Sequence, residues 1–365
     1  MKIIICIGYK MNVLSLSAKH FVVQNLCAFL NGHSGDEFWI VADRSVLPGE
    51  WSQPNVHLIP QTWDSFPAWG VRHLLIPGRA LRRVKWRQYD LALWIDCPPG
   101  RLKAQKSILF TSSRNLSNED SVLRKGIQGN QKAPVDAILY YALGKVPEFL
   151  KGLSGYAQMC HQVPIGLSID NTDISWDTRS KTREGLSEGK EYYLYTGPIG
   201  NGYGLIELLK AFSFLKKRSI STIQLVLSGP RLESFDQFSK ELITYYYRSD
   251  VRILDETSSI PEDQVMAAAY GLVFPNPASV DPVLILNAWK ANIPCILPVG
   301  SPLLDSDLEG WMTFANGNIS QLGDCLYTLY KDEKQRRILI QRSWQYWDAC
   351  NGEGKGSLDQ AMALA

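Results

Sequence analysis

The sequence predicts an α/β protein of two domains, each built on a parallel sheet. Three observations lead to this prediction. The 365 residues are enough for two domains of about 150 residues, each with its own core. Short apolar runs alternate with helix-like segments along the chain, which is typical of parallel sheets covered by helices. A polar stretch at residues 170–190 separates two such series.

The first half begins with a strand and a helix. Residues 2–7 are β-rich, and their apolar run is too short for a signal peptide. Leu16–Leu30 carries apolar residues at helical spacing and ends at Asn31-Gly32. Further short apolar runs with polar or Pro/Gly boundaries predict buried parallel strands. They occupy residues 38–42, 91–95 and 107–111, followed by an apolar segment at 135–143 and by residues 162–167.

The second half repeats this alternation. Strands are predicted at residues 191–196, 223–227, 251–254, 272–275 and 294–297. Helices are predicted at residues 205–217, 235–247, 262–270 and 283–291, with a last helical segment at 333–350. This order predicts a second parallel sheet with helices on both faces.

Composition and charge exclude several classes of protein. With 45% hydrophobic and 20% charged residues, the chain is globular rather than disordered, collagen-like or a coiled coil. The net charge of +2 argues against a nucleic-acid partner. The seven cysteines stand singly, which favours reduced thiols and a cytoplasmic location. The five histidines show no ligand spacing, so no metal site is expected.

The charge is divided unevenly between the halves. Residues 1–170 hold 19 basic and 12 acidic residues, whereas the remainder holds 19 and 24. A short basic segment in the first half can hold a phosphorylated partner or lie on an anionic membrane surface, and a solvated loop is the alternative. This segment contains Arg79, Arg82, Arg83, Lys85 and Arg87. The two halves are therefore expected to bind different ligands.

A glycine-rich turn at Thr196–Gly204 is the clearest candidate for a binding site. Its sequence, TGPIGNGYG, follows a predicted strand and opens a predicted helix. Glycines let the backbone approach a ligand closely, and the N–H groups at a helix start favour an anion such as a diphosphate. The dinucleotide fingerprint fails, because Leu205 stands where its third glycine belongs. We expect the backbone of Gly200–Gly204 to bind phosphate with help from Arg231; a plain tight turn is the alternative.

The second half resembles the nucleotide-sugar domain of family-4-type glycosyltransferases. Four segments carry the resemblance: LYTGPIGNGYGLIELLKAFSFLK, IQLVLSGP, VRILDETSSIPEDQVMAAAYGLVFPNPAS and PVLILNAWKANIPCILP. In the first half, Asn31-Gly32-His33 and Val163-Pro164-Ile165-Gly166 are similar to turns of the family. The resemblance implies an α/β fold of two Rossmann-like domains, with parallel sheets facing each other across a cleft.

The resemblance also implies how the chain divides its tasks. Residues 1–170 are expected to form an N-terminal Rossmann-like domain on the acceptor side, and residues 171–190 a linker. Residues 191–335 are expected to form a C-terminal nucleotide-sugar domain, and residues 336–365 a helix that returns towards the N-terminal domain. The implied reaction moves a sugar from a nucleotide-sugar donor to a glycan or lipid-linked acceptor, with retention and without metal or other cofactor.

This chain departs from the family at charged positions of the donor site. Pro198 and Tyr203 stand where the family has an Arg and a Lys that hold the diphosphate. Ser279 and Asn287 stand in place of two glutamates that contact the sugar and the ribose, and Thr111-Ser112-Ser113 in place of a histidine. Loss of one preorganised donor costs about 3–4 kcal/mol of transition-state stabilisation, so these replacements bear on activity.

Three charged residues are candidate substitutes. Arg231 and Asp281 are the catalytic candidates, and Lys290 is a further donor-site cation. The alternatives are solvated surface charges for Arg231 and Lys290, and a helix cap for Asp281. The residues expected to bind the donor are Gly197, Gly200, Gly202, Gly204, Arg231, Ser279, Asn287 and Lys290.

Two hypotheses from different classes stay open. The first is a cytoplasmic glycosyltransferase for cell-envelope polysaccharide, with a glycan or lipid-phosphate acceptor and peripheral contact at the inner membrane face. The second is a non-catalytic relative that acts as a glycan- or partner-binding subunit, which the replaced charges favour. A nucleotide-sugar epimerase has less support, because the second half contains no histidine.

Overall fold

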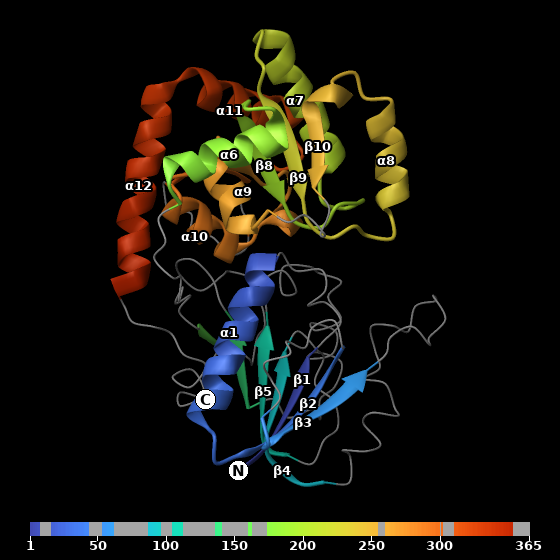
Figure 1. Ribbon diagram of the computed structural model, residues 1–365, viewed down its shortest axis with the longest axis vertical. Helices are drawn as coiled ribbons and strands as arrows, with labels where there is room; N and C mark the ends of the chain where they lie inside the picture. The colour runs from blue at the N-terminus through green and yellow to red at the C-terminus, as the bar shows by residue number, and fades with distance from the viewer. Residues whose placement is uncertain are drawn as a thin grey trace.

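The protein is described here from a computed structural model. The described residues are 1–7, 16–43, 53–61, 87–95, 104–111, 136–140, 160–162, 174–254, 260–299, 301 and 310–352. Figure 1 shows two α/β domains, one above the other along the longest axis of the molecule.

The first domain contains a seven-stranded sheet in the order β3-β2-β1-β4-β5-β6-β7. Every neighbouring pair of strands in it is parallel. The order starts at the central strand and proceeds outwards in both directions, as in Rossmann-like sheets. The strands are β1 (Lys2–Ile7), β2 (Glu37–Asp43), β3 (Val56–Gln61), β4 (Tyr89–Ile95), β5 (Ala104–Thr111), β6 (Ala137–Tyr140) and β7 (Cys160–Gln162).

Apolar side chains cover both faces of this sheet. Because side chains alternate along a strand, Ile3 and Ile5 of β1 point to one face, and Ile4 and Cys6 to the other. All four are at most 2% exposed. Helix α1 (Leu16–Gly32) packs its buried apolar side chains on the first of these faces. Both faces of β1 are therefore covered, which agrees with the continuous apolar run in its sequence.

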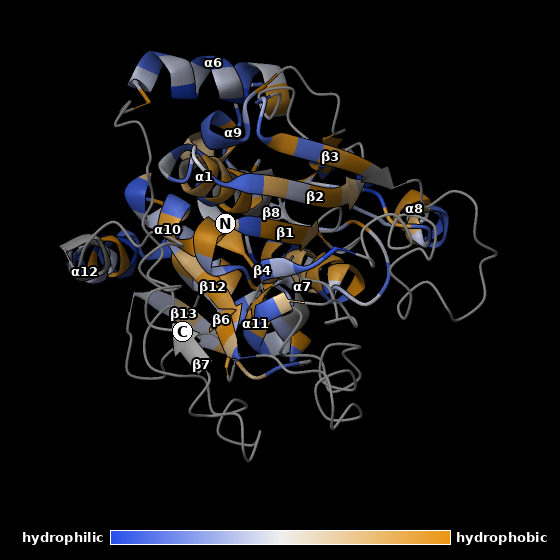
Figure 2. Ribbon diagram, turned by 90° about the horizontal axis from the view of Figure 1, so that it is seen from below, coloured by the Kyte–Doolittle hydropathy of each residue, from blue (hydrophilic) through white to orange (hydrophobic). Residues whose placement is uncertain are grey.

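The second domain contains a six-stranded sheet in the order β10-β9-β8-β11-β12-β13, again parallel throughout. Its strands are β8 (Tyr192–Thr196), β9 (Gln224–Ser228), β10 (Val251–Leu254), β11 (Gly271–Val273), β12 (Cys295–Pro298) and β13 (Trp311–Phe314). In Figure 2 the strands β1, β6 and β12 are predominantly hydrophobic.

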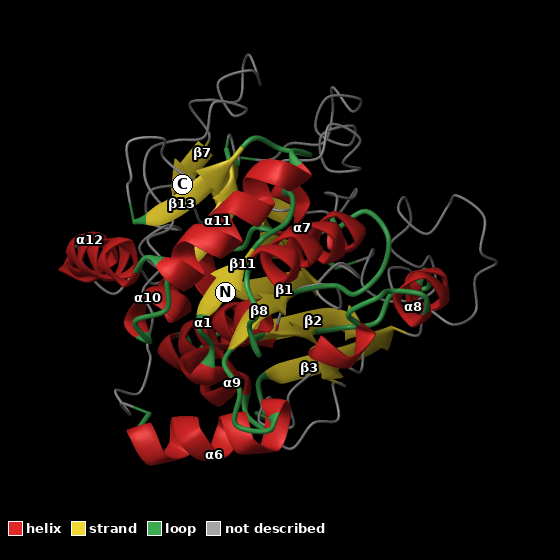
Figure 3. Ribbon diagram, turned by 90° about the horizontal axis from the view of Figure 1, so that it is seen from above, coloured by secondary structure: helices red, strands yellow, loops and turns green. Residues whose placement is uncertain are grey.

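Helices lie on both faces of the second sheet. The α-helices are α6 (Trp176–Ser187), α7 (Leu205–Arg218), α8 (Phe235–Ile243), α9 (Glu262–Ala268), α10 (Pro282–Lys290), α11 (Ile319–Lys331) and α12 (Glu333–Gly352). Two 3-10 turns are η5 (Arg248–Asp250) and η6 (Pro277–Ser279). α7 and α11 share one apolar cluster, whereas α9 and α10 belong to another. Figure 3 shows α7 and α11 on the opposite side from α6 and α9.

Residues 176–187, inside the expected linker, form helix α6. Ser175 caps it by accepting the Thr178 N–H at 3.2 Å. Arg183 ties it to α9 by donating from Nε to the Ala268 carbonyl at 2.9 Å. The helix buries few residues, and Figure 2 shows it as largely hydrophilic, which is why its composition resembles that of a linker. The domain limits stay a prediction, because residues 163–173 lie outside the described part.

The two sheets present their carboxyl edges to each other. In Figure 1 the strands of each domain point towards the other domain. Helix α1 of the first domain contacts α10 of the second. Helix α12 packs on α10 and α11, and Figure 1 shows its carboxyl end directed towards the first domain. The structure confirms the predicted fold class of two Rossmann-like α/β domains with parallel sheets.

Candidate functional site

The glycine turn, which we define as residues 197–204, follows β8 at the carboxyl edge of the second sheet. β8 has β9 on one side and β11 on the other, so the strand order reverses direction there. Ligands of open α/β sheets bind at such switch points, outside the carboxyl ends of the strands. The predicted candidate segment therefore lies where the topology places a binding site.

Strand β8 is a rigid support for this turn. The Tyr192 hydroxyl donates to the Val265 carbonyl of α9, and the Tyr193 hydroxyl to the Leu326 carbonyl of α11, each at 2.7 Å. Burial raises the pKa of both phenols above their usual value. Both therefore remain protonated donors at neutral pH, and the support does not titrate in that range.

Helix α7 starts at the end of the glycine turn without a side-chain cap. Its N-cap is Gly204, whose φ of +74° is a left-handed conformation that favours glycine. The first intrahelical bond runs from the Leu208 N–H to the Gly204 carbonyl at 2.9 Å. The N–H groups of the first turn have no acceptor within the helix, so this end of α7 suits an anion.

The glycine turn is bonded to the α8 turn, which we define as residues 229–234. The Ile199 N–H donates to the Pro230 carbonyl at 2.8 Å, and the Leu232 N–H to the Ile199 carbonyl at 3.0 Å. The Asn201 N–H donates to Ser234 Oγ at 2.9 Å. That amide, which lies within the predicted phosphate-binding run, is directed at α8.

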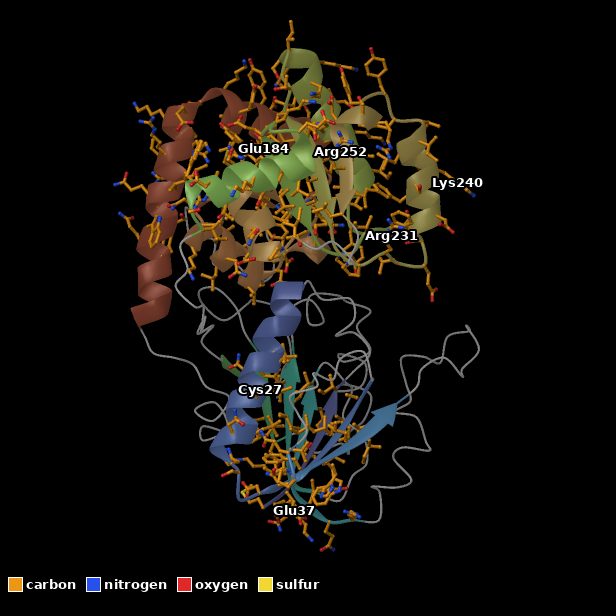
Figure 4. The ribbon with its side chains drawn as sticks, viewed as in Figure 1. Cys27, Glu37, Glu184, Arg231, Lys240 and Arg252 are labelled. Atoms are coloured by element: carbon orange, nitrogen blue, oxygen red, sulfur yellow. The ribbon has the colours of Figure 1, made fainter. Side chains whose placement is uncertain are left out.

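Arg231 is brought beside the glycine turn by this pairing. It forms a β-bridge with Ile199, and its guanidinium lies 4.4 Å from the centre of the Phe235 ring. The side chain is exposed at the face of the second domain that looks towards the first (Figure 4). Stacking on a ring holds a guanidinium in place while leaving its N–H donors at the edge of the plane.

Ser279 and Asp281 lie in the α10 turn, which we define as residues 274–281. The Ser279 hydroxyl donates to the Asn276 carbonyl at 2.7 Å, and its side chain is fully buried. Asp281 is the N-cap of α10: its Oδ1 accepts the Val283 N–H at 3.0 Å, and it is 2% exposed. Both side chains therefore stabilise local structure, as the capping alternative predicts for Asp281.

Asn287 and Lys290 lie farther along α10. The helix begins at the carboxyl edge of the sheet, because it follows β11 and precedes the parallel strand β12. With a rise of about 1.5 Å per residue, Asn287 lies about 8 Å and Lys290 about 12 Å beyond Pro282 along the axis. The structure thus brings the glycine turn, Arg231 and the α10 turn together, but places Lys290 at the far end of its helix.

Pro198 and Tyr203, at the positions where the resembled family has cations, differ in their surroundings. Pro198 is buried, and its carbonyl accepts the Tyr195 hydroxyl at 2.8 Å. Tyr203 is half-buried within the glycine turn. The position of Pro198 could not hold a charged side chain without burying it, whereas the position of Tyr203 could.

A carboxylate that the sequence analysis missed lies at the same edge. Glu262 begins α9, and its Oε1 accepts the Thr196 hydroxyl at 2.9 Å. Thr196 is the last residue of β8 and directly precedes the glycine turn. The two are 66 residues apart, so no local pattern predicts the contact.

The first domain is described only in part. Of the basic segment, Arg79, Arg82, Arg83 and Lys85 lie outside the described residues, as do Ser112, Ser113 and Val163-Pro164-Ile165-Gly166. Arg87 is exposed, with its guanidinium 5.1 Å from the centre of the Trp39 ring. Within the described ranges, no three His, Cys, Asp or Glu residues are grouped so as to hold a metal ion. No helix in those ranges is long and apolar enough to cross a membrane.

The capping role of Asp281 yields a testable expectation. Asp281→Ala should lower the free energy of unfolding by about 1 kcal/mol, the usual cost of a lost N-cap, whereas Asp281→Asn keeps an acceptor and should cost less. Urea unfolding measures both variants. Ser175→Ala removes the N-cap of α6 in the same way and serves as the comparison, with a similar expected loss. Equal stability of Asp281→Ala and the native chain would contradict the assignment.

Several solved structures are similar to this chain over nearly its full length. HepE of Anabaena, solved in complex with UDP and glucose, gives a TM-score of 0.71 at 15% identity, with 100% of both chains covered. WaaG, a glycosyltransferase involved in lipopolysaccharide biosynthesis, gives 0.70 at 15% identity, with 99% of this chain and 98% of that chain covered. Sucrose-phosphate synthase from Thermosynechococcus elongatus gives 0.67 at 13% identity, with 100% of both covered.

These similarities establish the fold. The chain has the two-Rossmann fold of B-type glycosyltransferases, as the resemblance in its sequence implied. The sequence itself matches no protein-family model and none of the curated proteins. At identities of 13–15% the similarity concerns architecture, and the activity is argued from the site.

Proposed function

We propose that this protein is a glycosyltransferase that moves a sugar from a nucleotide-sugar donor to a glycan or lipid-linked acceptor. The observation that carries the proposal is the glycine turn at the switch point of the second sheet, with Arg231 bridged to it through Ile199. The similarity to HepE, whose structure contains UDP and glucose, supports the same class of ligand. Residues 191–335 would bind the donor, and residues 1–170 the acceptor.

The charge chemistry of the proposed site differs from that of the family it resembles. As the bond from the sugar C1 to the diphosphate oxygen breaks, the leaving nucleoside diphosphate gains negative charge. The start of α7 and the Arg231 guanidinium would stabilise that charge. No step requires a metal in this scheme, and retention of configuration is part of the proposal only through the resemblance.

The remaining candidates take supporting positions in this proposal. Gly202 has open space around it and would allow a ligand to approach the backbone closely, whereas Gly200 and Gly204 allow the close packing of the α8 turn and the α10 turn on the glycine turn. Gly197 would take part in donor binding through its backbone, and Asn287 would hydrogen-bond a hydroxyl of the donor. Asp281 would act mainly through the start of α10, which it caps. A lipid-phosphate acceptor, with peripheral contact at the inner membrane face, remains a prediction that rests on the basic segment.

A binding-only protein is the second candidate, and two observations favour it. The hydroxyl of Ser279 is bonded within its own turn, and the Asp281 carboxylate caps a helix. Neither therefore replaces the glutamates of the family in a direct way. Such a protein would bind the nucleotide or the glycan without transfer.

Titration calorimetry with UDP, GDP, CDP and ADP tests donor binding. We expect at least one of them to bind with a Kd below about 1 mM, equivalent to about 4 kcal/mol. Release of nucleoside diphosphate from the matching nucleotide-sugar then tests transfer. Binding with release supports the glycosyltransferase, and binding without release on a glycan panel supports the binding-only protein. Absence of binding at millimolar concentrations contradicts the donor site.

A further inference from the structure

The side chain of Asn276 is bonded at both ends. Its Oδ1 accepts the Ser279 N–H at 3.2 Å, and its Nδ2 donates to the Gly202 carbonyl at 2.9 Å. A backbone donor on one side and a carbonyl on the other determine the orientation of the amide. Gly202 is 74 residues away in sequence, so this side chain joins the glycine turn to the α10 turn.

The same two segments also touch directly. A Cβ added at Gly204 would lie 3.1 Å from Pro275 Cβ and 3.2 Å from Asn276 Cβ. The second half of the glycine turn therefore packs directly on the α10 turn, and position 204 leaves no room for a side chain. The α10 turn is itself well closed, because Asn276 and Ser279 form a reciprocal capping box.

The two halves of the glycine turn are held by different partners. Ile199 and Asn201 are bonded to the α8 turn. Gly202, with a φ of +89°, is bonded to Asn276. Glycines at positive φ lose much conformational freedom on folding, so this half depends on a tie from outside the turn. It is also the half that leads into the first turn of α7.

We propose that Asn276 is a positioning residue of the donor site: its amide fixes the second half of the glycine turn against the α10 turn, and so aims the start of α7 at the diphosphate. This inference rests on the proposed function, because the ligand it positions is the nucleotide donor. Asn276 stands outside the glycine-rich motif and does not itself need to touch the ligand.

The variant Asn276→Ser separates the two bonds of this side chain. Serine is as good an N-cap as asparagine, so the bond to the Ser279 N–H is kept, while the donor to Gly202 is lost. We expect the Kd of the best-binding nucleoside diphosphate to rise about fivefold, the size expected for one neutral hydrogen bond. Amide hydrogen exchange of residues 200–206 should become faster in the unliganded chain, and the midpoint of urea unfolding should fall by no more than the loss of one hydrogen bond accounts for.

The variant Asn276→Asp adds a pH dependence that a merely structural role would not produce. An ionised Asp keeps the cap acceptor but cannot donate to the Gly202 carbonyl; a protonated one can do both. The ratio of its Kd to that of the native chain should therefore fall as the pH is lowered from 7 towards 4, where an Asp of ordinary pKa is about half protonated. The same ratio for Asn276→Ser should stay constant.

Asn318→Ser is the matched control. Asn318 caps α11 by accepting the Gln321 N–H, after β13, which lies three strands from β8. It should change neither nucleotide affinity nor exchange in the glycine turn. If the native chain binds nucleotide and Asn276→Ser binds it equally well, the positioning role is overturned while the proposed function stands. If the native chain binds no nucleotide, both are overturned; faster exchange in Asn276→Ser would then show only a structural tie.

Discussion

Gly229→Ala is expected to destabilise the second domain by about 3 kcal/mol or more. Gly229 has a φ of +136°, and a Cβ there would lie 2.2 Å from the Gly197 carbonyl oxygen. Backbone strain of this kind costs about 1–3 kcal/mol, and overpacking in a closed site adds about 1–3 kcal/mol. The neighbour is backbone, so it cannot rotate away. The midpoint of urea unfolding followed by circular dichroism measures the loss.

Gly317→Ala is the control that separates strain from collision. Gly317 has a φ of +76°, but nothing lies within 4 Å of an added Cβ. It should cost only about 1 kcal/mol, as expected for an alanine at positive φ. Equal losses for the two variants would mean that the ends of β8 and β9 can separate. The close approach of Gly229 and Gly197 would then not hold the glycine turn in place.

The predictability of the elements depends on how many of their residues are buried. β1, β4, β8 and β12 are fully or almost fully apolar, and their sequences alone indicate buried strands. β3 was not predicted: it is an edge strand with His57 and Leu58 exposed and Pro60 within it, so its pattern is broken. α11 was also missed, although Leu322, Leu326 and Leu329 have helical spacing that indicates it.

The candidate site shows a different limit. Local patterns are sufficient to predict the glycine turn and the capping role of Asp281. For Asp281 the pattern is an Asp directly before a proline at the start of a helix. Asn276 and Glu262 acquire their roles from partners 74 and 66 residues away. Ser279 is predicted from the sequence as a donor-site residue, and the bond of its hydroxyl within its own turn depends on the 3-10 geometry of η6. Contacts of this kind require the fold before they can be inferred.

Arg231→Ala is expected to raise the Kd of the nucleoside diphosphate, and to lower turnover with the nucleotide-sugar, by at least about tenfold. A hydrogen bond from a charged donor is worth about 1.5–3 kcal/mol, and about 1.4 kcal/mol is a factor of ten. Arg231 is exposed, so added salt should reduce the difference between variant and native chain. Arg231→Lys keeps the charge but not the planar fork, and should fall between the two.

Arg218→Ala is a closely matched control for this prediction. Arg218 is also exposed and also lies over an aromatic ring, at 5.5 Å from the centre of Tyr327. It ends α7, about 20 Å along the helix axis from the glycine turn. Both variants lose a similar cation–π contact. Arg218→Ala also removes the exposed ion pair with Asp324, which is worth about 0–1 kcal/mol, so both variants should lose only small amounts of stability. A loss of nucleotide affinity confined to Arg231→Ala therefore reports the charge at the site.

The outcome for transfer then decides between the enzyme and the binding-only protein. If Arg231→Ala, Lys290→Ala and Asp281→Asn each leave the rate of an active native chain unchanged, the assignment of the donor-site charges is wrong.

If the native chain binds nucleotide but transfers nothing, Tyr203→Lys restores one cation of the family at a half-buried position of the glycine turn. Pro198→Arg is a poorer choice, because Pro198 is buried and the guanidinium would be buried with it. Transfer gained by Tyr203→Lys would show that the fold and the nucleotide site were retained while the charge that stabilises the departing diphosphate was lost.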